Sequence, residues 1–308
     1  MVSRALKAHI LLVVATMVWG GTFALIKNAL VYASPLLFNA VRMVLAGLCL
    51  LLVFRKEIRR LTGEAVRAGV LVGVFLWLGF ELQTSGLRLT TPSKSAFLTG
   101  ISIVLVPLLL ALGWRRRISG WTVLGVGTAF CGLYLMTVPG SGFLELDFRS
   151  INRGDLLTLA CAVAFALHII SMGWATAKHP FQQIATLQAV AAAVLMLLTL
   201  PAVAGRIYWH WSALLIAAIL ITGLLNTAAG FGVQAWAQQF TPPTHTALIF
   251  SLEPVFAWIT SYILLQERLG VRATVGAVLI FGGVLISELK GSVAGPESEP
   301  HPVASMAD

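Results

Sequence analysis

Four ionisable side chains stand in the middle of long apolar stretches of this sequence: Arg42, Glu81, His168 and Glu253. A charged side chain at the centre of a membrane helix costs ~2.5–3.5 kcal/mol on insertion scales, so such residues are functional hypotheses by default. The two carboxylates are suited to bind a substrate amine or a proton. The arginine is expected to be structural and to pair with backbone carbonyls or a facing helix.

Glu253 directly precedes Pro254 in its apolar stretch. A proline removes one backbone donor, and it can thereby expose the carbonyl of Phe250, four residues earlier, to a polar cavity. A carboxylate beside such a kink is placed to bind an amine or a proton. The alternative is a structural glutamate that hydrogen-bonds to a neighbouring helix.

Lys94 and His245 each follow a proline at the start of a predicted helix, Pro92 and Pro243 respectively. Helix N-termini attract anions, and a cation there would strengthen a site for a carboxylate. A zwitterionic amino acid would satisfy both this cation and the carboxylates. The alternative for each side chain is a position at the membrane interface, with its polar end turned toward water.

Several further polar and aromatic side chains lie deep enough in apolar stretches to line a cavity. Each also has a packing role as its alternative, because amides bond helix to helix as readily as they bind a solute. A lone histidine among apolar neighbours is likewise more often a packing residue. The set comprises Gln83, His168, Asn226, Gln234, Trp19 and Trp77.

The elements that must position these residues are membrane helices. Of the 308 residues, 58% are hydrophobic and only 11% are charged, with a mean hydropathy of +0.90. A soluble domain carries roughly 25% charged residues. The net charge of +9 does not indicate nucleic-acid binding, because the basic residues form short clusters between apolar runs, at 55–60 and 114–117. Such clusters are typical of cytoplasmic loops.

The sequence contains no motif for a cofactor. It lacks a nucleotide-binding loop, an H-E-x-x-H zinc motif and a nucleophile elbow. Cys49, Cys131 and Cys161 all lie in apolar runs and form no C-x-x-C pair, so no metal site is indicated. Without an ATP site, a gradient of the solute or of protons must drive any transport.

A membrane span needs about 20 mostly apolar residues, and ten segments meet this requirement. They are 8–30, 35–53, 68–88, 94–112, 118–138, 155–174, 181–203, 211–235, 246–265 and 271–289. The first is expected to be a retained helix, since its apolar run is too long for a signal peptide.

Basic residues predict the orientation in the inner (plasma) membrane. With a cytoplasmic N-terminus, the cytoplasmic side carries Arg4, Lys7, Arg55, Lys56, Arg59, Arg60, Arg67, Arg115, Arg116, Arg117, Lys178 and Lys290. The opposite side carries fewer: Lys27, Arg88, Lys94, Arg149, Arg153, Arg206, Arg268 and Arg272. The positive-inside rule therefore favours both termini in the cytoplasm.

The second half of the chain repeats the first. A shift of 151 residues places Gly79-Phe80 on Gly230-Phe231 and Gln83 on Gln234, and the register holds over about 60 residues. Glu81 falls on Gly232, so this acid breaks the symmetry and is a candidate specificity determinant; alternatively, it is hydrated near the outer end of its span.

Each repeat unit has five spans. An odd number means that the second copy enters the membrane from the opposite side, as in carriers that work by alternating access. The predicted organisation is a first repeat at 1–138, a connecting loop at 139–154, a second repeat at 155–290 and a disordered cytoplasmic tail at 291–308.

Several motifs resemble one known family. They are Trp19-Gly20-Gly21-Thr22-Phe23, Arg42, the segment 90–98 (TTPSKSAFL), Thr246-Ala247-Leu248, the segment 251–256 (SLEPVF) and Gln266-Glu267-Arg268-Leu269. The sequence is similar to the EamA family of the drug/metabolite transporter superfamily along its whole span-containing length. One departure is Leu265-Gln266-Glu267, where the family more often has Leu-Gly-Glu. The resemblance implies a ten-helix inner-membrane carrier, often an exporter of amino acids or related metabolites.

The sequence thus predicts an all-α membrane protein that exports a small amphipathic metabolite, with membrane lipids as surroundings and protons as a candidate coupling ion. Its cavity is expected between spans one, three, four, six, eight and nine, a choice that follows the resemblance. Two alternatives are an intramembrane enzyme acting on lipid-linked substrates and a channel. No convincing acid–base constellation supports the first, and no filter segments or rings of like charge support the second. The oligomeric state stays open.

Overall fold

The computed structural model describes residues 3–87, 89, 95, 98–114, 118–137, 152–201, 207–265 and 270–290. These residues are overwhelmingly helical, and the only β-pairing among them is an isolated bridge between Ala33 and Trp209. The helices are α1 (Arg4–Ala29), α2 (Pro35–Val53), α3 (Arg55–Ile58), α4 (Gly63–Leu87), α6 (Ser102–Trp114), α7 (Gly120–Thr137), α8 (Arg153–Thr176), α9 (Phe181–Thr199), α10 (Ala213–Leu220), η3 (Ile221–Ala229), α11 (Gly230–Ala237), α12 (Pro243–Phe250), α13 (Glu253–Leu265) and α14 (Val271–Lys290).

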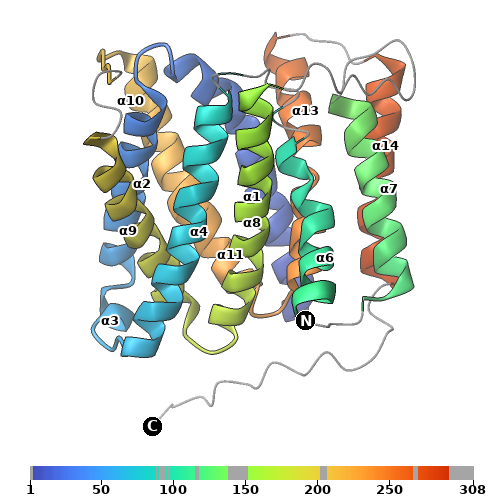
Figure 1. Ribbon diagram of the computed structural model, residues 1–308, viewed down its shortest axis with the longest axis horizontal. Coiled ribbons are helices and arrows are strands. Elements are labelled where there is room, and N and C mark those ends of the chain that lie inside the picture. Colours follow the sequence, from blue (N-terminus) through green and yellow to red (C-terminus); the bar gives the residue numbers. More distant parts are fainter. Residues whose placement is uncertain are drawn as a thin grey trace.

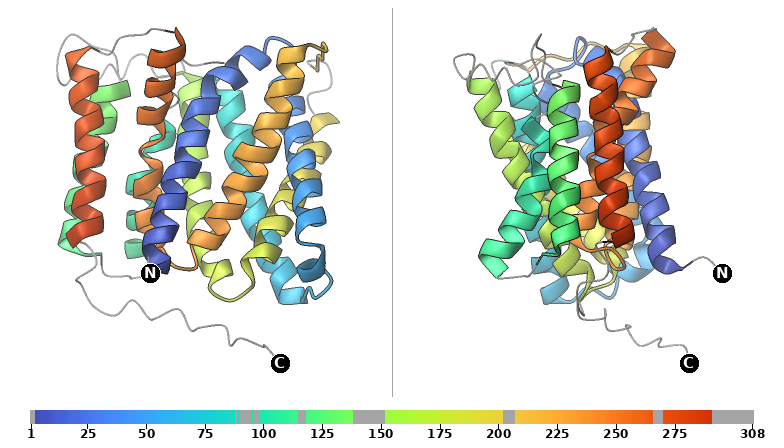
Figure 2. Two further views of the ribbon diagram at one scale, coloured as in Figure 1. Left: turned by 180° about the vertical axis from the view of Figure 1, so that it is seen from behind. Right: turned by 90° about the vertical axis from the view of Figure 1, so that its right-hand side faces the viewer.

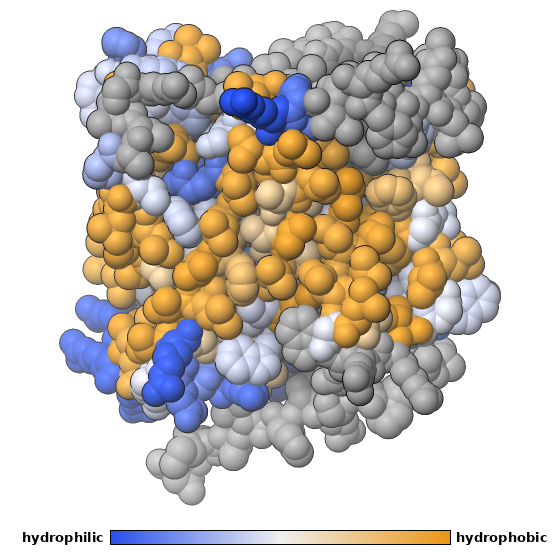
Figure 3. All heavy atoms as spheres, viewed as in Figure 1, coloured by the Kyte–Doolittle hydropathy of each residue, from blue (hydrophilic) through white to orange (hydrophobic). Residues whose placement is uncertain are grey.

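The long helices stand side by side and run between the two ends of one bundle (Figures 1 and 2). Helix α1 begins and α14 ends at the same end of the bundle, which is the lower end in Figure 1. Apolar side chains form a broad band around the middle of the visible face, and hydrophilic ones gather below it near α3 (Figure 3). Lipid tails are the solvent that such a band requires.

Six helical stretches are long and apolar enough to cross a membrane: Arg4–Thr22, Pro35–Val53, Gly63–Gly86, Arg153–Thr176, Phe181–Thr199 and Ala213–Ala237. Three shorter apolar helical stretches are Leu98–Gly113, which contains a turn at Ile101, Gly120–Leu135 and Val271–Ser287. These stretches overlap every predicted span except 246–265, which α12 and α13 occupy in two pieces. The all-helical membrane fold is confirmed, whereas the count of ten spans stays a prediction. The tail 291–308 and most of the loop 139–154 lie outside the described residues.

The helices in the predicted spans four and nine are interrupted at equivalent positions. Helix α12 ends at Phe250 and α13 begins at Glu253, with a turn at Ser251 and Leu252. The hydroxyl of Ser251 donates to the carbonyl of Leu248 at 2.6 Å and so satisfies one carbonyl at the end of α12. Pro254 fits in the first turn of α13, where a backbone N–H is not needed.

In the first half, a turn at Ile101 precedes Ser102, the first residue of α6. The 151-residue shift places Ile101 on Leu252 and Ser102 on Glu253. Broken membrane helices are where carriers expose backbone groups to a solute or an ion. The interruption is therefore a shared feature of both halves and not a peculiarity of Pro254.

The predicted span eight contains a π-helix, η3, between α10 and α11. Its counterpart in the first half lies within α4, which is α-helical from Gly63 to Leu87. π-Helical segments are rare and occur often at functional sites. This segment is therefore a clear structural difference between the two halves.

Helices α7 and α14 pack along each other through a reciprocal pair of glycine contacts (Figures 1 and 2). A Cβ on Gly125 would lie 2.6 Å from the carbonyl oxygen of Gly283, and a Cβ on Gly132 would lie 2.5 Å from that of Gly276. The repeat places Gly125 on Gly276 and Gly132 on Gly283. Each of the two contacts is therefore the repeat counterpart of the other. Contacts of this kind are those of a local two-fold axis between antiparallel helices.

Candidate functional site

Aromatic rings from both halves meet at the centre of the bundle. The rings of Phe80 in α4 and Phe231 in α11 lie 6.0 Å apart between centroids, at an interplanar angle of 78°. These residues are counterparts in the 151-residue repeat, so the two halves contact each other here through the same repeat position. Edge-to-face contact at this distance is a favourable arrangement for aromatic pairs.

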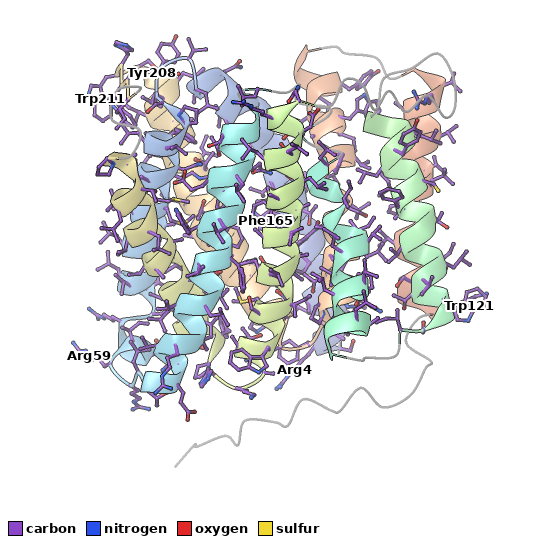
Figure 4. All side chains as sticks on the ribbon, in the orientation of Figure 1. Arg4, Arg59, Trp121, Phe165, Tyr208 and Trp211 are labelled. Carbon is purple, nitrogen blue, oxygen red and sulfur yellow. The ribbon has the colours of Figure 1, made fainter. Side chains whose placement is uncertain are left out.

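Two further rings extend this contact symmetrically. Trp19 of α1 packs on Phe231 at 5.2 Å, and Phe165 of α8 packs on Phe80 at 5.7 Å. A shift of 146 residues carries α2 onto α9, and the same shift carries Trp19 onto Phe165. Figure 4 labels Phe165 in the middle of the bundle, beside α4. We call one set of six rings the aromatic cluster: those of Trp19, Phe80, Phe165, His168, Phe231 and Phe250.

Glycines permit the rings to approach the helices so closely. A Cβ on Gly79 would lie 2.5 Å from a ring carbon of Phe165, and a Cβ on Gly230 would lie 2.5 Å from Nε1 of Trp19. Gly79 and Gly230 are the glycines that precede Phe80 and Phe231. The Gly-Phe pair in each repeat thus provides both a ring and the space for the neighbouring ring.

One side of the aromatic cluster carries a hydrogen-bonded polar group. The indole Nε1 of Trp19 donates to the carbonyl of Asn226 at 2.8 Å. The side-chain amide of Asn226 donates to Oγ1 of Thr22 at 2.7 Å, and both side chains are buried. Asn226 belongs to the π-helix η3, so these two bonds hold the irregular segment of span eight to α1.

The other side carries His168 and Gln188. Nε2 of His168 lies 2.8 Å from Oε1 of Gln188 in α9, and both residues are buried. The His168 ring also packs edge-to-face on Phe231 at 5.6 Å. Among the described residues, Nε2 of Gln188 has no hydrogen-bond partner. An unsatisfied buried donor of this kind is costly and points to a missing partner such as water or solute.

Arg42 reaches the aromatic cluster from α2. Its Cζ lies 4.3 Å from the centroid of the Phe80 ring and 5.9 Å from that of Phe38. The side chain is only 3% exposed, and its Nε has no hydrogen-bond partner within the described part of the chain. The arginine faces a neighbouring helix, as the sequence suggested, but its partner is a ring of the aromatic cluster.

Glu253 lies in the first turn of α13, where the helix dipole favours a negative charge. Helix α1 approaches this point closely, since a Cβ on Gly20 would lie 2.5 Å from the carbonyl oxygen of Glu253. Phe250, which ends α12, packs on Trp19 at 4.8 Å. The interruption that holds Glu253 is therefore adjacent to the aromatic cluster.

Glu81 follows Phe80 but contacts a different helix. Thr199, at the end of α9, donates its hydroxyl to Oε1 of Glu81 at 3.4 Å. Trp77 lies one turn earlier in α4 and is partly buried. Gln83 is partly buried on the same helix. Trp77 also packs against the buried core that contains Phe80 and Phe231.

The remaining predicted residues have other surroundings. Gln234 is fully buried and donates to Oε1 of Gln238 at 2.9 Å, while Gln238 donates to the carbonyl of Ile169 at 2.8 Å. This chain of bonds matches the packing alternative for an amide. The ring of His245, in the first turn of α12, lies 6.3 Å from that of His9. Lys94 lies outside the described residues.

Sequence reasoning singled out Trp19, His168 and Asn226, and the structure brings these three to the aromatic cluster. The sequence patterns did not indicate the phenylalanines of the aromatic cluster or Gln188 as site residues. For Phe80 and Phe231 a signal was available, because the repeat aligns them. Gln188 has no comparable signal, since its counterpart under the shift of 146 residues is Arg42.

Comparison with known proteins gives consistent results. The model of the EamA-like transporter family matches this chain twice, over residues 6–138 and 152–289. An uncharacterized transporter of Archaeoglobus fulgidus is 31% identical over 288 residues, which cover 93% of this chain and 87% of that protein. The threonine/homoserine exporter RhtA of Escherichia coli K12 is 29% identical over 176 residues, which cover 55% of this chain and 56% of RhtA.

A solved crystal structure has the same fold, with a TM-score of 0.76 at 16% sequence identity, covering 93% of this chain and 98% of that one. The names of the family and of these relatives denote transporters and not enzymes, so the alternative of an intramembrane enzyme is not supported. The two family matches together span nearly the whole helical part of the chain. This protein is therefore a multi-pass membrane transporter that belongs to the EamA-like transporter family.

Proposed function

We propose that this protein is a secondary exporter of amino acids or closely related amphipathic metabolites, and that it works by alternating access. The observation that carries the proposal is the contact between Phe80 and Phe231. In this contact, a pair of repeat counterparts meets with polar groups on both sides, as a two-fold axis between inverted repeats would require. A solute held at such an axis is equally reachable from two openings that the two-fold rotation relates.

The proposed membrane arrangement comprises ten spans in two inverted repeats of five helices. The reciprocal glycine contacts of α7 with α14 support it, as do the matched interruptions before Ser102 and Glu253. Both termini would lie on the cytoplasmic side of the inner membrane. The basic residues at the lower end of the bundle, among them Arg4 and Arg59, support this orientation (Figure 4).

The residues around the aromatic cluster match the parts of an amino acid. Glu253, at the interruption of span nine, is proposed to bind the substrate amine or a coupling proton. Arg42 provides the positive charge for a carboxylate, with Lys94 as a second candidate cation. The amide of Gln188 offers a free donor, and the rings would contact an apolar side chain. The name of RhtA, a threonine/homoserine exporter, supports this substrate class.

The remaining predicted polar residues have supporting roles in this proposal. Glu81 is proposed as a second coupling carboxylate, whose hydrogen bond to Thr199 joins α4 to α9. Gln83, Trp77 and His245 are proposed to line the solute path toward the two ends of the bundle. Gln234 would hold α11 to α8 through Gln238.

Counterflow in proteoliposomes tests the proposal directly. Vesicles loaded with an unlabelled amino acid should accumulate the labelled compound above its equilibrium level, and empty vesicles should not. The panel includes threonine, homoserine, aromatic amino acids and nucleosides, each with and without a pH gradient. Counterflow of nucleosides alone would contradict the substrate class. A non-saturable flux without counterflow would contradict the carrier mechanism.

A further inference from the structure

An apolar cavity of about 380 Å³ lies beside the η3–α11 helix, between this helix and the end of α2. Its wall includes Cys49 and Val53 of α2, Ala228 of η3, and Gly232 and Trp236 of α11. Phe54 and Phe181, whose rings are 5.9 Å apart, line the end of the cavity toward α3. The wall is almost wholly apolar, so the cavity is suited to a hydrocarbon and not to a polar solute.

At two positions in the middle of the cavity wall, the second repeat has a smaller residue than the first. Ala228 corresponds to Trp77, and Gly232 corresponds to Glu81. In the first repeat these positions hold an indole and a carboxylate that bonds to Thr199. In the second, a Cβ on Gly232 would meet only Leu50, at 4.0 Å, among the described residues. These two small residues leave space beside α2 that a tryptophan at position 228 would fill.

The cavity has the length of an acyl chain in one leaflet. Its wall follows the helix from Leu224 to Trp236, which is at most about 18 Å at the α-helical rise of 1.5 Å per residue, since the π-helical part rises less. Half of the roughly 30 Å hydrocarbon core is about 15 Å. The cavity thus runs from the lower end of the bundle to about the middle of the membrane.

Cations surround the open end of this hydrocarbon-shaped space. Nζ of Lys7 lies 5.6 Å from the centroid of the Trp236 ring, and Trp236 lines the cavity. Arg55 and Lys56 directly follow Phe54, and both are exposed; Glu57 is the acidic residue in the same turn. Figure 4 shows Arg59 and Arg4 at this same end of the bundle. Basic residues beside an intramembrane crevice are the arrangement that recognises anionic headgroups.

We propose that an anionic phospholipid of the leaflet at this end binds here, with one acyl chain in the cavity and its phosphate at Lys7, Arg55 and Lys56. The chain would then pack against the segment that Asn226 ties to α1. Bound lipid would therefore support the π-helical form of span eight. The proposal depends on the cavity and its cations, and it does not require the substrate assignment made above.

Native mass spectrometry of the full-length protein tests this site, with dioleoyl phosphatidylglycerol and dioleoyl phosphatidylcholine as probes. The wild type should retain phosphatidylglycerol in preference to phosphatidylcholine. Ala228→Trp introduces the residue that fills the counterpart position, and it should abolish this adduct. Gly232→Leu is the second filling variant if Ala228→Trp does not fold. Ala160→Trp is the matched control, since it adds the same bulk to an exposed helix face.

The headgroup contacts need a separate variant. Replacing Lys7, Arg55 and Lys56 by glutamine should weaken phosphatidylglycerol binding about 100-fold at low salt, since each cation near an anionic lipid surface contributes about a factor of five. Lys290→Gln should leave binding unchanged, although Nζ of Lys290 also lies over a tryptophan ring, that of Trp121, at 4.6 Å.

Three results would overturn the proposal. The first is equal retention of the two lipids by the wild type. The second is a phosphatidylglycerol adduct that survives both filling variants. The third is loss of a protein dimer, and not of a lipid adduct, when Ala228 is replaced, because the cavity would then hold a second copy of the chain.

Discussion

Phe80 and Phe231 occupy the same position in the two halves of this chain, and their rings meet at 6.0 Å between centroids. Within its own half, each phenylalanine is one of many apolar residues and follows a glycine in an apolar helix. Their contact joins the two halves through the same repeat position. Arg42, His168 and Asn226 all lie around this pair, so any change at the pair should affect the whole site.

Phe80→Ala and Phe231→Ala should destabilise the protein by similar amounts, about 3–5 kcal/mol each, because each removes a large ring from a packed centre. The double variant should cost less than the sum, since the direct aromatic contact contributes about 0.5–1.5 kcal/mol beyond packing. Equilibrium unfolding in mixed micelles measures all three. Strict additivity would show that the two rings do not interact.

Gly125→Val should prevent stable packing of α7 on α14, because its Cβ would lie 2.6 Å from the carbonyl oxygen of Gly283. Gly127→Val is the matched control on the same helix, where a Cβ meets no heavy atom within 4 Å among the described residues. Thermal unfolding in detergent should show a much lower midpoint for the first variant alone. Equal midpoints would remove the glycine contact as the basis of this interface.

Asn226→Leu should reduce the transport rate more than it reduces stability. It removes the hydrogen bond to Thr22, and such bonds between membrane helices contribute only about 0.6 kcal/mol on average. The variant keeps the bond from Trp19 Nε1 to the backbone carbonyl of residue 226, so the π-helical segment would be held to α1 by one bond and not two, which should alter the transport cycle. Thr227→Val is the control, because the buried Oγ1 of Thr227 has no partner among the described residues. Counterflow rates and unfolding free energies separate the two effects.

Glu253→Gln should abolish counterflow or uncouple it from the pH gradient, since the amide can neither bind a proton nor attract an amine. Glu64→Gln is the matched control, because Glu64 is exposed in the first turn of α4. Uptake is compared with and without a pH gradient for both variants. Unchanged counterflow and unchanged coupling in Glu253→Gln would remove this residue from the site.

Ser119 and Gly270 are counterparts in the repeat, and they directly precede α7 and α14. Single cysteines at these positions should be labelled from opposite sides of the membrane, because α7 and α14 run in opposite directions. The background lacks Cys49, Cys131 and Cys161, and an impermeant maleimide is applied to intact cells and to inverted vesicles. Labelling of both positions from the same side would exclude an inverted repeat.

The sequence alone determined the class of protein. Apolar runs of about 20 residues, few charges and a 151-residue repeat predicted an all-helical membrane protein with two related halves, and most helix bounds followed closely. The apolar runs and the scarcity of charge are properties of the local sequence, and a bilayer requires both of any helix that spans it. The start of α8 at Arg153 is a local signal too, since the side chains of Asn152 and Asp155 form a reciprocal capping box. The repeat also aligned Phe80 with Phe231 before their contact was known.

Only the tertiary structure decided which side chains face one another. In a membrane helix, lipid and protein core are both apolar, so hydrophobic periodicity does not reveal the buried face. For this reason the sequence could not show that Glu81 and Phe80 face different neighbours. In the structure, Glu81 contacts Thr199 and Phe80 contacts Phe231. The pairing of His168 with Gln188 and the position of Arg42 over Phe80 depend on helix rotation in the same way. That rotation is set by packing between helices far apart in the chain.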